Sequence, residues 1–180
     1  MRFFNIKQHR NRIPHEEQQR TFEAWVTDHK TVLFKIVRAY AFTPADRDDL
    51  FQEMLVEVWR SVVSFKKQCA VSTWMYRVAL NTAMKWNRQE SRRVGNEPLE
   101  REGQLLIANS AETDERLEWL YEQIAKLNKA DRSLALLLLD GFSYKEMATI
   151  VGISVNHVGV KINRIKKHLI AQSEAMEYAS

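Results

Sequence analysis

The chain has 180 residues, of which 45% are hydrophobic, and a net charge of +4. This length and apolar content allow one medium domain or two small ones and exclude a largely disordered chain. The single Cys69 excludes a disulfide framework, and the five histidines show no metal-ligand spacing. No apolar run reaches the roughly 18 residues of a membrane span, and no signal-peptide core follows the basic N-terminus. We therefore expect a soluble cytoplasmic protein.

Five glycines and three prolines leave long stretches without a breaker, which predicts an all-α architecture. We expect two small helical domains, at 16–93 and 116–172, joined by a flexible acidic linker at 94–115. The linker has one basic residue against six acidic ones, whereas both flanking blocks are net basic. Two positive blocks separated by an acidic bridge are typical of a protein that grips a polyanion at two places. The basic segment 1–15 receives no role.

The first block is predicted to hold three amphipathic helices. Apolar residues recur at helical spacing between Phe22 and Val37, and Pro44 then breaks the chain. The helix after Pro44 has an apolar arc that includes Leu50 and Met54. Its opposite arc is acidic and polar. Taken alone, this arc suits a plain solvated surface better than a protein-docking face.

The third helix is predicted from Thr73 to Arg93, with Trp74 near its start. A row of polar and basic residues follows one face: Arg77, Asn81, Lys85, Arg88 and Arg92. Cationic side chains bind phosphates, an asparagine can hydrogen-bond a base edge, and a tryptophan can stack on an unpaired base. By itself, however, such a row is more typical of a solvated helix face beside a buried tryptophan.

The second block begins near Arg116 and contains a predicted helix-turn-helix. Gly152 can take a positive φ where a helix ends, and Ser154 can cap the next helix. That helix, 155–170, is basic and has no acidic residue, which suits the DNA major groove. Packing through Ile150, Ile153, Val158 and Ile162 would leave four residues to face DNA, namely Asn156, His157, Lys161 and Arg164. A polar tail is expected at 172–180.

No catalytic constellation accompanies these segments. Carboxylates recur on the second helix, but no nucleophile, metal-ligand cluster or phosphate-binding glycine loop lies near them in sequence. We therefore expect no enzymatic activity, no cofactor, no metal and no small-molecule substrate. From the residues alone, the open hypotheses include a stand-alone helix-turn-helix regulator and a helical adaptor that does not bind DNA.

Three segments, in this order, make the sequence similar to the extracytoplasmic-function group of bacterial RNA polymerase sigma factors. Residues 49–53 (DLFQE), followed by 58–61 (VWRS), resemble the polymerase-binding helix of that family. Phe65 and residues 72–83 (STWMYRVALNTA) resemble its −10-reading and melting segment. Residues 144–169 resemble its −35-reading domain. The match covers roughly 20–93 and 116–170.

The resemblance implies a role for each segment. Asp49, Gln52 and Glu53 would bind the clamp helices of the largest polymerase subunit. The −10 element would be bound by Phe65, Lys66, Lys67, Trp74, Arg77, Asn81, Lys85 and Arg88. The −35 element would be bound by Ser154, Asn156, His157, Lys161 and Arg164. The implied partners are core RNA polymerase, through its largest and second-largest subunits, and promoter DNA, with an anti-sigma factor as a candidate inhibitor.

Three positions depart from the family pattern within the recognition helix. Gly159 and Val160 stand where a basic residue and a serine are common, and Ile165 stands where alanine is usual. Gly159 weakens a helix by up to about 1 kcal/mol relative to alanine. The −35 base preference is therefore expected to differ from that of typical members.

The stand-alone regulator would explain 116–170 but leaves the first block without a role.

Overall fold

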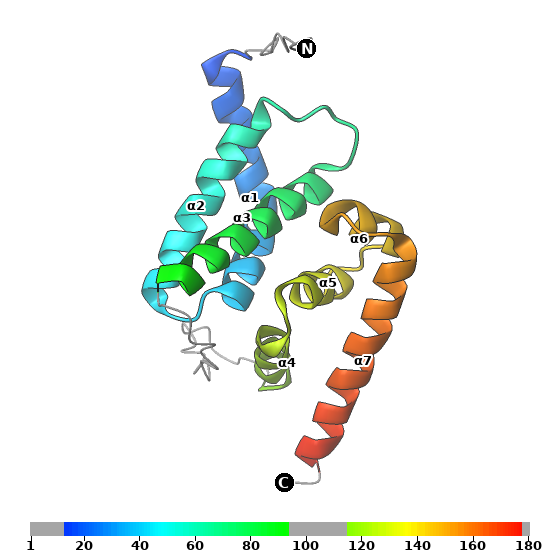
Figure 1. The fold of residues 1–180 in the computed structure, drawn as a ribbon. Coiled ribbons are helices and arrows are strands. Elements are labelled where there is room, and N and C mark those ends of the chain that lie inside the picture. The colour runs from blue at the N-terminus through cyan, green and yellow to red at the C-terminus, as the bar shows by residue number, and fades with distance from the viewer. Residues whose placement is uncertain (1–12, 94–114, 178–180) are drawn as a thin grey trace, which may run out of the picture.

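The computed structural model describes residues 13–93 and 115–177, which form α-helices and no strand (Figure 1). The expected all-α class is therefore confirmed for this part of the chain. The linker predicted at 94–115 falls outside the described residues except for Glu115, and so does most of the N-terminal segment 1–15. The helices are α1 His15–Tyr40, α2 Pro44–Val62, α3 Val71–Arg93, α4 Glu115–Lys126, α5 Lys129–Leu139, α6 Tyr144–Val151 and α7 Val155–Glu177.

Helices α1, α2 and α3 pack against one another as a three-helix unit. The chain turns from α1 into α2 at Thr43, whose hydroxyl accepts a hydrogen bond from the backbone N–H of Asp46. Pro44 follows at the first helical position, where the missing N–H leaves no hydrogen bond unmade. The apolar arc of α2 predicted from the sequence is buried, with Leu50 and Met54 fully inaccessible.

Helices α4 to α7 form the second unit, and several of their boundaries have a local cause. Asn128 caps α5, and Ser143 and Glu146 form a reciprocal capping box at the start of α6. Gly152 ends α6 with φ 77°, and the Ser154 hydroxyl accepts a hydrogen bond from the backbone N–H of His157. The predicted helix-turn-helix is thus present as α6 and α7.

The C-terminal end of α7 differs from the sequence prediction. The polar tail expected at 172–180 is helical as far as Glu177. The helix predicted over 155–170 therefore ends later than expected. The segment contains no Gly or Pro to stop the helix, and glutamine, glutamate, alanine and methionine are all good helix formers.

The two units are packed together. Helix α1 contacts α4 and α5, and α3 contacts α6. The buried Tyr40 hydroxyl, from the end of α1, donates to the Lys129 carbonyl at 2.8 Å and pairs with the Ser133 hydroxyl at 2.7 Å. Arg132 of α5 donates to the carbonyl of Ala39 in α1 at 3.1 Å. One continuous apolar core therefore runs through both units.

Asp140, at the end of α5, joins the second unit to two helices of the first. Its carboxylate accepts from the Lys35 ammonium at 2.5 Å and from the Tyr76 hydroxyl of α3. The Tyr76 ring also meets Phe142 edge-on, at 4.9 Å between centroids. Lys35, Tyr76 and Asp140 lie far apart in sequence, so this group forms only when the whole chain folds.

The buried tyrosines predict a loss of stability at alkaline pH. Burial raises the pKa of Tyr76, helped by its hydrogen bond to Asp140, and burial also raises the pKa of Tyr40 and Tyr121. In the unfolded chain these phenols ionise near their ordinary pKa of about 10. The protonated, buried tyrosines therefore stabilise the fold fully below about pH 10. Above that pH the free energy of unfolding falls, by at most about 1.4 kcal/mol per pH unit for each tyrosine.

Urea unfolding between pH 8 and pH 11 checks this prediction. Tyr76→Phe keeps the ring and removes the hydroxyl, so its free energy of unfolding should fall less steeply above pH 10. The control is Tyr144→Phe, since Tyr144 is exposed at the start of α6. It should keep the wild-type slope. If the free energy of unfolding of Tyr76→Phe fell with pH as steeply as that of the wild type, Tyr76 would not be a source of the alkaline loss of stability.

Candidate nucleic-acid interface

Helix α3 presents the basic row expected from the sequence. Its inner face is buried through residues that include Met75, Tyr76 and Leu80. Arg77, Asn81 and Lys85 are exposed on the outer face, as the helical period requires. The side chain of Arg88 lies outside the described residues. The row therefore has two exposed cations and an exposed amide at one-turn intervals, which suits contact with a nucleic-acid strand.

The loop between α2 and α3 places its residues in two different settings. Lys66 and Lys67 are exposed, and Lys67 has a left-handed backbone with φ 55°, which is uncommon outside glycine. Phe65, in the loop, and Trp74, in the first turn of α3, are half-buried. The Phe65 ring lies 5.0 Å from Trp25 and 5.5 Å from Trp74, and the Trp74 indole N–H donates to the Ser61 hydroxyl at 3.0 Å. These two aromatic side chains thus anchor the loop to the three-helix unit.

The acidic and polar arc of α2 lies on the outside of the three-helix unit. Asp49 and Gln52 are exposed and Glu53 is half-buried. Next to them the Phe51 ring stacks on Phe34 of α1, 5.0 Å apart with an angle of 3° between the rings. Phe34 remains 55% exposed. This aromatic pair was not predicted from the sequence, because no periodicity within one helix reveals a contact with another.

Helix α7 presents most of the expected −35 residues to solvent. Asn156, His157 and Arg164 are exposed, and Ser154 is held in the cap. Lys161 is different, because its ammonium binds the Asp131 carboxylate of α5 at 2.7 Å. Its charge is therefore partly neutralised within the second unit.

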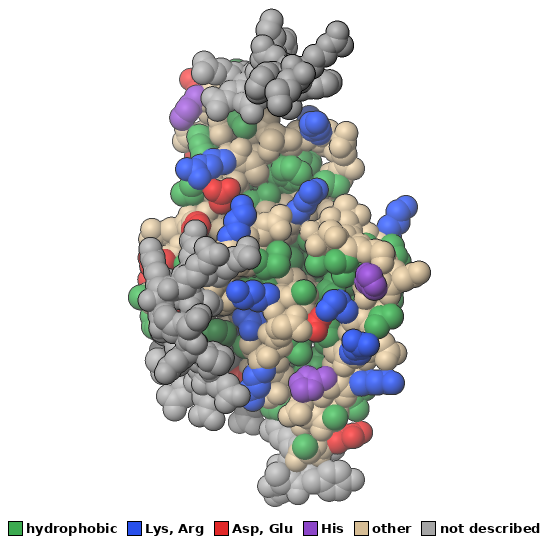
Figure 2. Space-filling view, in the orientation of Figure 1, with side chains coloured by type: hydrophobic (Ala, Val, Ile, Leu, Met, Phe, Trp, Pro, Cys, Tyr) green, Lys and Arg blue, Asp and Glu red, His purple; other side chains and the backbone are tan. Residues whose placement is uncertain are grey.

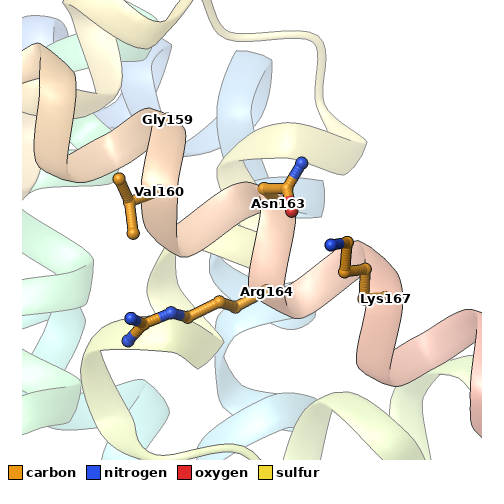
Figure 3. A pocket seen from close by; sticks show the side chains of 5 residues that line it. All are labelled: Gly159, Val160, Asn163, Arg164 and Lys167. Carbon is orange, nitrogen blue, oxygen red and sulfur yellow. The ribbon is translucent and has the colours of Figure 1, made fainter.

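Three further exposed residues continue this outer face of α7. Val160, Asn163 and Lys167 follow Asn156 at intervals of three or four residues, so the helical period was the signal that could have found them. Figure 3 shows Val160, Asn163, Arg164 and Lys167 in succession along the helix. With Gly159 they line a shallow, open hollow. The outer face of α7 is thus partly apolar and partly basic.

The surface charge follows the same layout. In Figure 2, Lys and Arg side chains predominate over Asp and Glu on the face that carries α3 and α7. Within residues 13–93 and 115–177, no group of three or more His, Cys, Asp or Glu side chains is placed to hold a metal ion. No helix in the described part of the chain is long and apolar enough to cross a membrane.

Comparison with known proteins agrees with this layout. A family model described as sigma-70 region 2 matches residues 19–93, and one described as sigma-70, region 4 matches residues 117–169. The ECF RNA polymerase sigma-E factor of Escherichia coli (strain K12) is 28% identical over 163 residues, which cover 83% of this chain and 84% of that protein. RNA polymerase sigma factor CnrH of Cupriavidus metallidurans is 27% identical over 172 residues, with 87% and 88% covered.

Two solved structures share the fold. CnrH in complex with the cytosolic domain of CnrY gives a TM-score of 0.62 at 24% identity and covers 87% of this chain and 90% of that one. The sigma factor RpoE in complex with the anti-sigma factor NepR from Bartonella quintana gives 0.71 at 18% identity, with 83% and 94% covered.

The chain belongs to the extracytoplasmic-function sigma factors, the sigma-70 relatives that bind core RNA polymerase and direct it to start transcription at promoters. The region 2 match accounts for the first helical unit, which a stand-alone regulator would leave without a role. The hypothesis of a stand-alone helix-turn-helix regulator is therefore rejected.

Proposed function

We propose that the two helical units are two promoter-binding domains, at 16–93 and 116–172, joined by the linker at 94–115. The first domain docks on core polymerase and opens the −10 element, and the second binds the −35 element. The observation that carries this division is that each unit exposes its own basic helix face, on α3 and on α7. Catalysis belongs to the polymerase, so the chain acts in the cytoplasm without enzymatic activity of its own.

The polymerase-docking face is formed by Asp49, Gln52 and Glu53 of α2. Its acidic and amide groups suit hydrogen bonds and ion pairs with the clamp helices of the largest subunit. The stacked Phe34–Phe51 pair lies directly beside it and supplies apolar area, since aromatic side chains are enriched in protein interfaces. The acidic linker would lie in the RNA exit path between the largest and second-largest subunits, where its charge mimics nucleic acid.

The −10 site is formed by α3 and the loop before it. Lys66, Lys67, Arg77, Lys85 and Arg88 bind phosphates, and Asn81 contacts a base of the opened strand. Extruding a base costs a few kcal/mol in lost stacking and pairing, which these contacts offset. In this proposal Phe65 and Trp74 hold the base-capturing loop in place and border the opened strand, in keeping with their packing on Trp25 and Ser61.

The −35 site is formed by the N-terminal half of α7. Asn156 and His157 face the major groove and Arg164 anchors the helix beside it. The N-terminus of the helix, capped by Ser154, approaches a phosphate. Lys161 adds positive charge, although its ion pair with Asp131 leaves it less available than Arg164.

Regulation by an anti-sigma factor is part of the proposal. Both similar solved structures hold a partner protein, the cytosolic domain of CnrY in one and the anti-sigma factor NepR in the other. In each comparison more than four fifths of both chains is covered, so the likeness to these partner-bound proteins extends over the whole fold. Co-purification of the native protein from its host, without stress, checks whether such a partner is bound.

Replacing Asn81 by alanine should impair promoter opening more than promoter binding. Asn81 is exposed, so its loss should leave the fold intact while it removes a base contact worth about 1–3 kcal/mol. Open complexes, measured by permanganate reactivity of unpaired thymines, should fall about 5- to 100-fold for the holoenzyme. Retention of closed duplex promoter DNA should change much less. An equal loss of both signals would mean that Asn81 acts only through the fold.

A further inference from the structure

The hollow on α7 contains a glycine that neither the backbone nor the packing requires. Gly159 lies in the middle of a helix and has no positive φ, unlike Gly141 and Gly152. A Cβ built at Gly159 would come no closer than 3.8 Å to its nearest neighbour, the Tyr144 ring, which is ordinary van der Waals contact. Alanine would therefore fit here and would strengthen the helix by up to about 1 kcal/mol.

The side chains around Gly159 have complementary chemistry. Val160 is 50% exposed and offers methyl groups to solvent. Asn163, one turn further on, offers an amide with both a donor and an acceptor. Arg164 and Lys167 follow on the same face, so that cations flank the amide and the apolar patch (Figure 3).

Each group matches one feature of an A·T pair in the major groove. An asparagine amide pairs with adenine N6 and N7, and an apolar side chain contacts the thymine methyl group. Residues at i and i+3 lie about 5–6 Å apart on a helix, so Val160 and Asn163 can reach opposite ends of one base-pair edge. Arg164 and Lys167 are placed for the neighbouring phosphates. The missing side chain at Gly159 lets the helix backbone approach the DNA closely.

We infer that the hollow formed by Gly159, Val160 and Asn163 is a base-reading site for one A·T pair of the −35 element. The inference rests on the proposed −35 role of α7 and makes it specific. Thymine is recognised through its methyl group against Val160, and adenine through the Asn163 amide. Arg164 and Lys167 bind backbone phosphates and add affinity without base preference.

The test uses holoenzyme made from the full chain and its cognate core polymerase, with a pool of duplex DNA randomised over the promoter region. The bound fraction is sequenced. The wild-type protein should enrich one A·T pair at a fixed upstream position. Asn163→Ala should lower the preference for that A·T pair about 5- to 100-fold, and Val160→Ser should lower the same preference several-fold. Gln172→Ala, exposed on α7 beyond the hollow, is the control and should enrich the same sequences as wild type.

Gly159→Ala gives a second, independent readout. It should raise the thermal unfolding midpoint of the free chain and yet lower the affinity of the holoenzyme for the enriched sequence. If Gly159 had only a structural role, a more stable chain would not bind the enriched sequence more weakly. Unchanged affinity of the Gly159→Ala holoenzyme would overturn the inference.

The same holoenzymes, assayed for DNA selection and for transcription, distinguish failure of the inference from failure of the proposed function. If Asn163→Ala and Val160→Ser enrich the same base pairs as wild type with the same strength, the A·T site is refuted. If the wild-type holoenzyme starts transcripts at defined sites without upstream base preference, the sigma function stands and the A·T site is again refuted. If no promoter-specific transcript forms and the chain does not bind core polymerase, both are refuted.

Discussion

Replacing Arg132 by methionine should lower the free energy of unfolding by about 2–5 kcal/mol, because a buried carbonyl that loses its donor costs about 1–3 kcal/mol. Arg132 is buried in α5, and its guanidinium donates to backbone carbonyls of Ala39, Ala125 and Leu127, at or near the ends of α1 and α4. Helix C-termini carry partial negative charge and unsatisfied carbonyls, so the cation is compensated without a carboxylate. The guanidinium also lies over the Tyr40 ring, 4.9 Å from its centroid. Methionine would fill the space but would take this donor from the buried carbonyl of Ala39 and from the partly buried carbonyls of Ala125 and Leu127.

Urea unfolding of the free chain at neutral pH measures the loss. The matched control is Arg20→Met on α1, because Arg20 is largely exposed and makes only a surface pair with Glu16 at 3.6 Å. That change should cost at most about 1 kcal/mol. If Arg132→Met cost no more than Arg20→Met, the buried guanidinium would not be what joins α1, α4 and α5.

The double change Gln52→Ala with Glu53→Lys should weaken binding to core polymerase by about 30-fold or more. The estimate follows from the 2 kcal/mol or more that loss of a hydrogen-bonded charge pair costs at an interface, to which the reversed charge adds repulsion. Helix α2 should stay folded, because its buried residues, such as Leu50 and Met54, are unchanged. Affinity is measured by fluorescence anisotropy of the chain labelled at Cys69, its only cysteine, which is exposed.

Glu23→Lys on α1 makes the same reversal of charge at an exposed position away from the docking face. It should bind core polymerase as wild type does, which separates a local contact from a general effect of net charge. Unchanged affinity of the Gln52→Ala, Glu53→Lys protein would mean that the arc of α2 is a plain solvated surface.

Much of the local structure followed from the sequence because its causes are local. The turn at Gly152, the cap at Ser154, the start of α2 at Pro44 and the buried arcs of α2 and α3 all depend on residues within one or two helical turns. The polar row on α3 was predictable for the same reason. Once the buried face of a helix is known, the helical period decides which of its residues lie outward.

The contacts between the two units could not be predicted in this way. Lys35, Tyr76 and Asp140 meet only because α1, α3 and α5 converge, and no sequence spacing encodes that meeting. The ion pair of Lys161 with Asp131 has the same origin, so the availability of Lys161 to DNA was not visible from its helix alone. The packed arrangement of Phe65 and Trp74 likewise depends on Trp25, which lies about forty residues earlier in the chain.

The packing of the units also bears on promoter binding. It covers the side of α3 that holds Tyr76 and leaves Asn81 and Lys85 on the opposite side exposed. The outer face of α7 is exposed as well, at Val160 and Arg164. Both candidate DNA-binding faces are therefore accessible while the two units remain in contact.

Run-off transcription with purified core polymerase tests the central claim most directly. Genomic DNA fragments serve as templates, and reactions with and without the full chain are compared by sequencing transcript 5′ ends. We expect transcripts from a small set of defined start sites that appear only when the chain is added and that are lost with Gln52→Ala, Glu53→Lys. The absence of any start site that depends on the chain, together with the absence of binding to core polymerase, would contradict its assignment as a sigma factor.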